Sequence, residues 1–232
     1  METHVSQWED SYFRNENFIF YPKDEVIKFI NRFVRKRIGF SNYINIIDFS
    51  ENKIKGLDYG CGIGASARLM AEFDIDAFGI DISSLAINQA INISKSHGIS
   101  KECPKFMLFD GEKIPFKDNE FDISIAESVL DSMEFELAKI VIKELSRVTS
   151  KFIFISLISG DDDCHHREYS GEEVVMGQHE NGTIQSYFNM TKINELISET
   201  GLLIKWCRLV TEESVIDKYK YSRYYIVLEH NA

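Results

Sequence analysis

The stretch Leu57-Asp58-Tyr59-Gly60-Cys61-Gly62-Ile63-Gly64 places three glycines at alternate positions directly after an acidic residue. The stretch lies where an expected strand, 53–59, ends and an expected helix, 65–73, begins. Glycine at such a junction allows a tight turn and lets the backbone approach a ligand at contact distance. In an open α/β sheet, ligands bind at the carboxyl ends of the strands. The stretch therefore predicts a ligand site at this turn.

Outward from this turn, strands and helices alternate. Expected strands are 53–59, 77–81, 105–109, 121–126 and 151–158, and expected helices are 65–73, 84–97 and 134–148. This alternation predicts a parallel sheet with helices on both faces, and right-handed crossovers give a doubly wound layout. A last helix, 191–200, precedes two strands, 203–211 and 223–229. The expected fold class is α/β, with a mostly parallel seven-stranded sheet and an antiparallel C-terminal edge strand.

A chain of 232 residues with 44% hydrophobic content is expected to form one domain. Its expected parts are an N-terminal cap and helix (1–50), a core (53–158), an insertion or lid (159–189), and a C-terminal helix with a strand pair (190–232). In the first part, a helix is expected to start at the N-cap Asp24 and to stop at Gly39.

Composition disfavours several kinds of partner. The formal net charge is −11 and the basic residues form no long run, so binding to nucleic acid or anionic lipid is disfavoured. No secretion signal and no membrane-length apolar run is seen, which predicts a soluble, cytoplasmic protein with no membrane partner. The oligomeric state is not predicted. The scattered cysteines, with no CxxC pair, indicate reduced thiols and no structural zinc.

Two further strand ends carry acids. Asp81 lies in Gly79-Ile80-Asp81-Ile82-Ser83, where a carboxylate can accept both hydroxyls of a ribose; the alternative is an Asp/Ser helix cap. Asp110, followed by Gly111, could accept from an exocyclic adenine amine; the alternative is a solvated loop acid. The glycine spacing differs by one residue from the G-x-G-x-x-G of dinucleotide binders. Asp58 beside the turn suits a ligand with an ammonium group rather than a pyrophosphate.

The motifs LDYGCGIG, GIDIS and FDGEKIPFKDNEFDISIAESVLDSM resemble, in order and spacing, the core of the Rossmann-like, seven-stranded (class I) S-adenosylmethionine-dependent methyltransferases. The resemblance covers about residues 53–158 and implies S-adenosylmethionine as cofactor and S-adenosylhomocysteine as product. Because a sulfonium methyl is already electrophilic, no metal is expected. Within this family, the sequence resembles the stand-alone bacterial enzymes that modify small molecules. The residues that it places around the cofactor are Asp58, Tyr59, Gly60, Cys61, Gly62 and Gly64 at the methionine part, Asp81 and Ile82 at the ribose, Asp110 and Gly111 at the adenine, and Glu127 and Ser128 at the methyl-transfer centre.

The acceptor side is expected from the less familiar segments. Residues 159–187 form a long loop, expected to be a structureless lid. It contains His165, His166 and His179, which with Glu127 are the candidates for a general base. A metal site and a solvated polar loop are the alternatives for these histidines.

Three other groups of residues have two interpretations each. Tyr187 and Phe188, with Arg167 and Glu168, form either the walls of an acceptor pocket or part of the core. Aromatic residues near the N-terminus either cap the cofactor cleft or pack on the sheet edge. These are Trp8, Tyr12 and Tyr21. A basic helix face either receives an anionic acceptor or is the solvated side of its helix. Its residues are Lys28, Arg32, Arg35 and Lys36.

The expected function is methyl transfer to a small polar metabolite, at oxygen, such as a sugar or a phosphorylated or nucleotide-linked precursor of bacterial surface polysaccharide (capsule). This acceptor class rests on analogy. Two alternatives stay open: a nicotinamide-dependent (NAD-type) oxidoreductase on the same fold, and a non-catalytic protein that binds S-adenosylmethionine as a sensor or scaffold.

Overall fold

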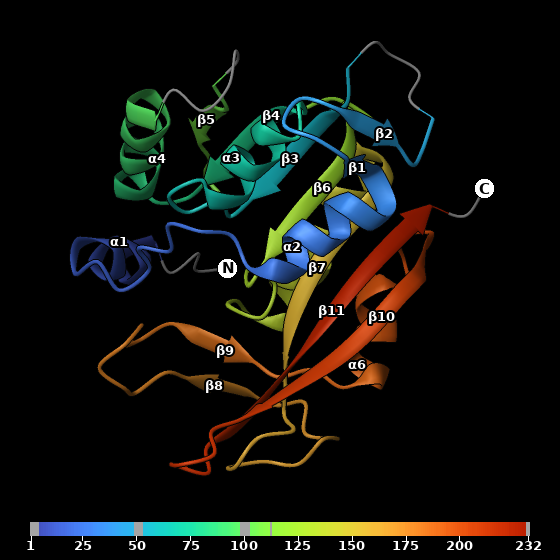
Figure 1. Cartoon of the computed structure of the whole chain (residues 1–232). Helices are drawn as coiled ribbons and strands as arrows, with labels where there is room; N and C mark the ends of the chain where they lie inside the picture. The colour runs from blue at the N-terminus through green and yellow to red at the C-terminus, as the bar shows by residue number, and fades with distance from the viewer. Residues whose placement is uncertain (1–4, 49–52, 98–102, 112, 231–232) are drawn as a thin grey trace.

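The protein, described by a computed structural model over residues 5–48, 53–97, 103–111 and 113–230, is built on a seven-stranded sheet in the order β10-β11-β7-β6-β3-β4-β5 (Figure 1). The strands are β3 Lys55–Tyr59, β4 Asp76–Asp81, β5 Lys105–Leu108, β6 Phe121–Glu127, β7 Thr149–Ser159, β10 Leu202–Glu213 and β11 Lys220–His230. The five neighbouring strands β7, β6, β3, β4 and β5 are parallel to one another. Strand β11 is antiparallel to β7, and β10 is antiparallel to β11. This confirms the predicted mostly parallel sheet with an antiparallel C-terminal edge.

The strand β7 shows why the centre of the sheet carries a run of apolar residues. Side chains alternate between the two faces of a strand, so a strand covered on both sides needs apolar residues at every position. Ile153 and Ile155 join one hydrophobic cluster, whereas Phe152 and Phe154 join a second cluster on the other face. The run of apolar residues therefore fits a central strand rather than an edge strand.

Helices cover both faces of the sheet. On one face, α2 Asp24–Phe29 and α3 Ala65–Glu72 pack in the cluster that contains Phe154. On the other face, α5 Phe135–Val148 and α6 Met190–Ile197 pack in the cluster that contains Ile155. The helix α4 Ser84–His97 packs against β4 and β5, and also against α1 Val5–Phe13. Across the described ranges, every helix is too short or too polar to cross a membrane.

The N-terminal helix differs from the prediction at both ends. Lys23, not Asp24, is the N-cap, and Asp24 is already helical. The helix changes to a π-helical turn at Ile30–Val34 and ends there. The chain continues as a small hairpin of β1 Arg35–Arg37 and β2 Tyr43–Asn45, so no helix reaches Gly39. Arg35 lies in this hairpin and donates to the backbone carbonyls of Phe73 and Asp74 at the end of α3. The early end of the helix therefore places a buried cation where carbonyl groups need a donor.

The sequence predicted that the insertion 159–187 is structureless, and this prediction is wrong. It contains an antiparallel hairpin of β8 Glu172–Val174 and β9 Ile184–Ser186, which projects on the same side of the molecule as α1 (Figure 1). The chain then returns to the core, where Phe188 is fully buried and Tyr187 is 6% exposed. For these two residues the core interpretation is correct.

Candidate functional site

The glycine turn lies at the carboxyl end of β3, and its backbone requires glycine. The φ angles are +65° at Gly60, +51° at Gly62 and +81° at Gly64, in the left-handed region that side chains disfavour. Neighbouring side chains also leave no room. A Cβ on Gly60 would lie 2.6 Å from Val129, and one on Gly62 would lie 2.6 Å from the Tyr12 hydroxyl. The turn is thus a close-packed cradle under the N-terminal segment.

Two adjoining cavities open beside this turn. The smaller has a volume of about 110 Å³ and a mostly apolar lining that includes Tyr59, Ile80, Ile82, Phe109, Val129, Met133 and Leu137. The larger has a volume of about 460 Å³ and a mixed lining, whose polar members include Asp58, Cys61, Glu127, Asp131, His179 and Arg223. The walls that both cavities share are Trp8, Tyr12, Gly60, Ser128 and Ser132. One elongated ligand with an apolar end and a polar end would therefore fit across both.

Asp81 lies at the end of β4 and lines the smaller cavity. Its two carboxylate oxygens accept from the backbone N–H groups of Gly62, at 2.8 Å, and Ser83, at 2.9 Å. These bonds fix the orientation of the side chain and tie the glycine turn to β4. Burial raises the pKa of Asp81 to about 6. The helix-cap alternative therefore holds in part, and it coexists with a carboxylate at the cavity wall.

Asp58 is the second-last residue of β3 and lines the larger cavity. It is 3% exposed, and its carboxylate accepts from the N–H of Ala67 in the first turn of α3 at 2.9 Å. Burial raises the pKa of Asp58 to about 8, against the effect of this hydrogen bond. A cationic group of a ligand beside Asp58 would supply the missing counter-charge.

The third strand end contributes less than expected. Gly111 and Phe109 line the smaller cavity, and the ring of Phe109 meets that of Tyr59 edge to face at 5.9 Å. Asp110 itself is exposed and is not among the residues that line either cavity. The structure therefore brings Phe109 and Gly111 to the site, but not the Asp110 side chain.

Glu127, at the end of β6, belongs to a partly buried polar network in the larger cavity. One of its oxygens, Oε1, is 2.8 Å from Nζ of Lys23 and accepts from the hydroxyls of Ser128 and Ser156. Burial alone would raise the pKa of Glu127, but Lys23 and Arg223 outweigh it and hold the pKa below its usual value. Glu127 is thus an ionised acceptor of hydrogen bonds at neutral pH.

The network continues through residues that sequence reasoning missed. Arg223 of β11 donates to Asp131 at 2.6 Å and to the hydroxyl of Ser156 at 3.4 Å. Lys23 reaches Glu127 from more than 100 positions earlier in the chain, and Arg223 reaches Asp131 from 92 positions later. Only the fold brings these charges together, although a lone Arg in the apolar strand β11 is a signal that could have been noticed.

The helix α1 covers the cleft. Trp8 and Tyr12 line both cavities, as the cap interpretation expected, whereas Tyr21 is 78% exposed and lines neither. The helix is anchored by Glu9, whose carboxylate accepts from the N–H groups of Ser84 and Leu85 at the start of α4. An acid at a helix N-terminus satisfies unpaired donors and the helix dipole together.

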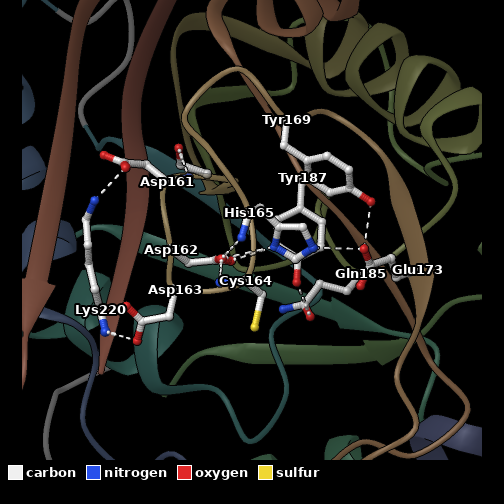
Figure 2. A network of polar contacts seen from close by, with 11 residues as sticks. Asp161, Asp162, Asp163, Cys164, His165, Tyr169, Glu173, Gln185, Tyr187 and Lys220 are labelled. Carbon is white, nitrogen blue, oxygen red and sulfur yellow. Dashed lines mark hydrogen bonds and ion pairs between the residues drawn. The ribbon is translucent and has the colours of Figure 1, made fainter. Parts of the chain in front are cut away.

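The histidines of the insertion lie apart from the cavities, with one exception. Figure 2 shows His165 against the rings of Tyr169 and Tyr187, with carboxylates at both ring nitrogens: Asp162 at 3.0 Å and Glu173 at 3.0 Å. The hydrogen bond with Asp162 raises the pKa of His165. Its ring therefore clips the loop to β8, and the expectation that it is a base has no support from its position.

The other two histidines also differ from the expectation. His166 is exposed and lines neither cavity. His179 does line the larger cavity, and its Nε2 is 3.2 Å from the carbonyl oxygen of Glu16. The hairpin tip is further held by the N–H of Glu180, which donates to the Glu16 carboxylate. The N-terminal segment and the β8–β9 hairpin thus meet over the cleft.

The remaining expected residues lie outside the cavities. Arg167 and Glu168 are exposed, and neither is a cavity wall. The basic helix face does not form one surface, because Arg35 is buried and Lys28 pairs with Asp24.

The four cysteines have free thiols, and within the described residues no group of His, Cys, Asp and Glu has the arrangement of a metal site.

The chain matches known methyltransferases. A family profile described as a methyltransferase domain matches residues 50–213. The chain is 25% identical to the chloroplastic tocopherol O-methyltransferase of Arabidopsis thaliana over 214 residues, which cover 86% of this chain and 55% of the relative. It is 33% identical to a sterol 4-C-methyltransferase of Caenorhabditis elegans over 137 residues, or 53% of this chain and 40% of the relative. The chain spans about half the length of these curated relatives.

A solved structure shares the fold. Magnesium protoporphyrin IX methyltransferase from Synechocystis PCC 6803, solved with bound S-adenosylmethionine, has a TM-score of 0.59 and 14% identity over 100% of this chain and 86% of its own. Because the family profile matches most of the chain and the sheet has the order and direction described above, the chain belongs to the class I S-adenosylmethionine-dependent methyltransferase family.

Proposed function

We propose that the protein transfers the methyl group of S-adenosylmethionine to a small polar acceptor. The observation that carries the proposal is the pair of adjoining cavities at the glycine turn, one apolar and walled by Asp81, the other polar and walled by Asp58. An adenosine would lie in the smaller cavity, with its ribose hydroxyls at Asp81. The methionine end, with its cationic groups, would lie beside Asp58 and the glycine turn.

The chemistry demands little beyond orientation. The cofactor, when bound, supplies an electrophilic methyl group on a sulfonium, so the protein has to align the acceptor and exclude water. Alignment of this kind supplies on the order of 7 kcal/mol of the barrier in favourable cases. The segments that would exclude water here are α1, through Trp8 and Tyr12, and the hairpin tip around His179 and Glu180.

The acceptor would enter the larger cavity, whose polar lining favours a polar molecule. Glu127 is placed to orient an acceptor hydroxyl by accepting its hydrogen bond. Because the pKa of Glu127 is held low, it orients that hydroxyl better than it stores the proton. The proposed acceptor atom is oxygen. Within the described lining, no feature distinguishes a sugar from other small polar molecules, so the proposal stops at this class.

Two measurements test the proposal. S-Adenosylhomocysteine should raise the midpoint of thermal unfolding and NADH should not, because only a ligand that binds the native state stabilises it. Label should then pass from methyl-labelled S-adenosylmethionine into a metabolite extract. Binding without any labelled product would favour a sensor or scaffold, and a shift with NADH alone would favour an oxidoreductase.

A matched pair of variants on one strand locates the site. Asp81→Asn should weaken S-adenosylhomocysteine binding by about 1–3 kcal/mol, since a charged acceptor is lost at the ribose hydroxyls. Asp76→Asn, at the opposite end of β4 and paired with Lys105 on the surface, should leave binding unchanged. Equal affinity in both variants would remove Asp81 from the cofactor site.

A further inference from the structure

Asp131 combines deep burial with an unused hydrogen-bond acceptor. It lies between β6 and α5, lines the larger cavity and is 3% exposed. Its Oδ2 accepts from the N–H of Ile158 at 2.8 Å and from Arg223 at 2.6 Å. Its Oδ1 is buried and has no hydrogen-bond partner among the described residues. Since buried polar atoms are normally satisfied, this oxygen lacks a donor of the kind that a ligand or a bound water supplies.

The position of Asp131 is fixed by its neighbours rather than by its own flexibility. Arg223 and the Ile158 N–H hold one oxygen, and its own backbone carbonyl accepts from the N–H of Ser186 at 2.8 Å. The side chain therefore cannot rotate to satisfy Oδ1 without breaking an ion pair. This is the preorganised acceptor that a binding site requires.

The charge of the larger cavity selects among possible acceptors. Five carboxylates line it and only two permanently cationic side chains do: Glu16, Asp58, Glu127, Asp131 and Glu180, against Lys23 and Arg223. Both cations are already paired, Lys23 with Glu127 and Arg223 with Asp131. Glu16 pairs with Arg14 outside the lining. A phosphate or carboxylate on the acceptor would therefore find no unpaired cation among these lining residues, so its desolvation would go uncompensated in a partly dehydrated space.

We infer that the methyl acceptor is an uncharged or cationic small molecule that donates a hydrogen bond, from a hydroxyl or amino group, to Oδ1 of Asp131. The inference rests on the proposed function and narrows it. Phosphorylated and nucleotide-linked acceptors, which the sequence had suggested, are disfavoured because Lys23 and Arg223 are already paired. Asp131 binds and positions the acceptor, and the positively charged methionine end of the cofactor offsets Asp58 on the other side of the cavity.

The first experiment needs no variant. A metabolite extract of a bacterial culture is divided on an anion-exchange resin into an unretained fraction, neutral and cationic, and a retained anionic fraction. Each is incubated with the protein and methyl-labelled S-adenosylmethionine. At least tenfold more labelled product is expected from the unretained fraction. Comparable or greater labelling of the retained fraction overturns the inference but supports the proposed function. No labelling of either fraction overturns both.

The second experiment tests Asp131 itself. In Asp131→Asn the concentration of unretained fraction that gives half-maximal labelling should rise at least tenfold, while the Kd for S-adenosylhomocysteine changes less than threefold. Glu144→Gln is the matched control, because it breaks a carboxylate–arginine pair, with Arg147, far from the cavities. It should leave both values unchanged. An unchanged half-maximal concentration in folded Asp131→Asn overturns the role of Asp131.

Discussion

Binding of S-adenosylhomocysteine is expected to remove a proton from Asp58 at neutral pH. Burial raises the pKa of this carboxyl to about 8, and the charges of Asp81 and Glu127 add to the effect. At pH 7 the free protein therefore holds Asp58 about 90% protonated. The methionine ammonium beside Asp58 would favour the carboxylate and return its pKa toward about 4.

The sign and size of the effect follow from this difference. The bound state carries fewer protons than the free state, so the affinity rises with pH until the free carboxyl is itself ionised, near pH 8. Between pH 6 and pH 8 the expected gain is about 50-fold, or about 2.3 kcal/mol, with most of it below pH 7. Asp81, with a pKa of about 6, contributes mainly below this window.

Isothermal titration calorimetry measures the effect directly. At pH 7 the heat of binding should depend on the ionisation enthalpy of the buffer, with about 0.9 proton released per ligand. In Asp58→Asn, whose side-chain oxygen keeps the bond from the Ala67 N–H, the affinity should be nearly constant from pH 6 to pH 8. Wild-type affinity that does not change with pH, or an equal slope in Asp58→Asn, would refute the reasoning.

Three further predictions concern the segments that close the cleft. His165→Phe keeps the ring contacts but loses both carboxylate partners. Because the pKa of His165 is raised in the folded protein, the stabilisation from these partners is present at pH 6 and is lost as pH rises through that pKa. The variant should therefore lower the midpoint of thermal unfolding more at pH 6 than at pH 9. The exposed His166→Phe should change it at neither pH, and an equal loss at both pH values in His165→Phe would contradict the clip. Glu9→Gln should weaken the anchorage of α1 by about 1 kcal/mol and speed S-adenosylhomocysteine dissociation in stopped-flow measurements, whereas the exposed Asp10→Asn should not. His179→Ala should keep turnover within about threefold, because a general base contributes about 100-fold or more and this side chain is 63% exposed; a loss of that size would make it the base.

The sheet could be predicted from the sequence because its signals are local. The apolar run of β7, the glycine turn after β3 and the acid that ends β4 each reside in a few consecutive residues. The family resemblance rested on the same motifs. Each of these three signals is set by local backbone geometry or by the burial of a strand on both faces, and a short stretch of sequence is enough to show it.

The parts that failed depend on contacts across the chain. The helix that begins at Asp24 ends at Val34, and the next residue, Arg35, donates to the carbonyl of Phe73 at the end of α3. The periodicity of apolar residues in the helix cannot reveal this distant contact. The β8–β9 hairpin consists of strands of three residues each, and all three residues of β8 are exposed, so no alternation of apolar and polar residues reveals it. The pairing of Asp131 with Arg223 likewise exists only after folding. Histidines were chosen by residue type, and residue type does not give position.

The most direct test is a crystal structure of the protein with S-adenosylhomocysteine. The adenine is expected in the cavity beside Phe109, the ribose hydroxyls at the Asp81 carboxylate, and the methionine ammonium within reach of Asp58, with the sulfur facing the cavity that holds Asp131. A nucleoside bound elsewhere, or a cleft filled by Tyr12 and Trp8 under saturating ligand, would contradict the account.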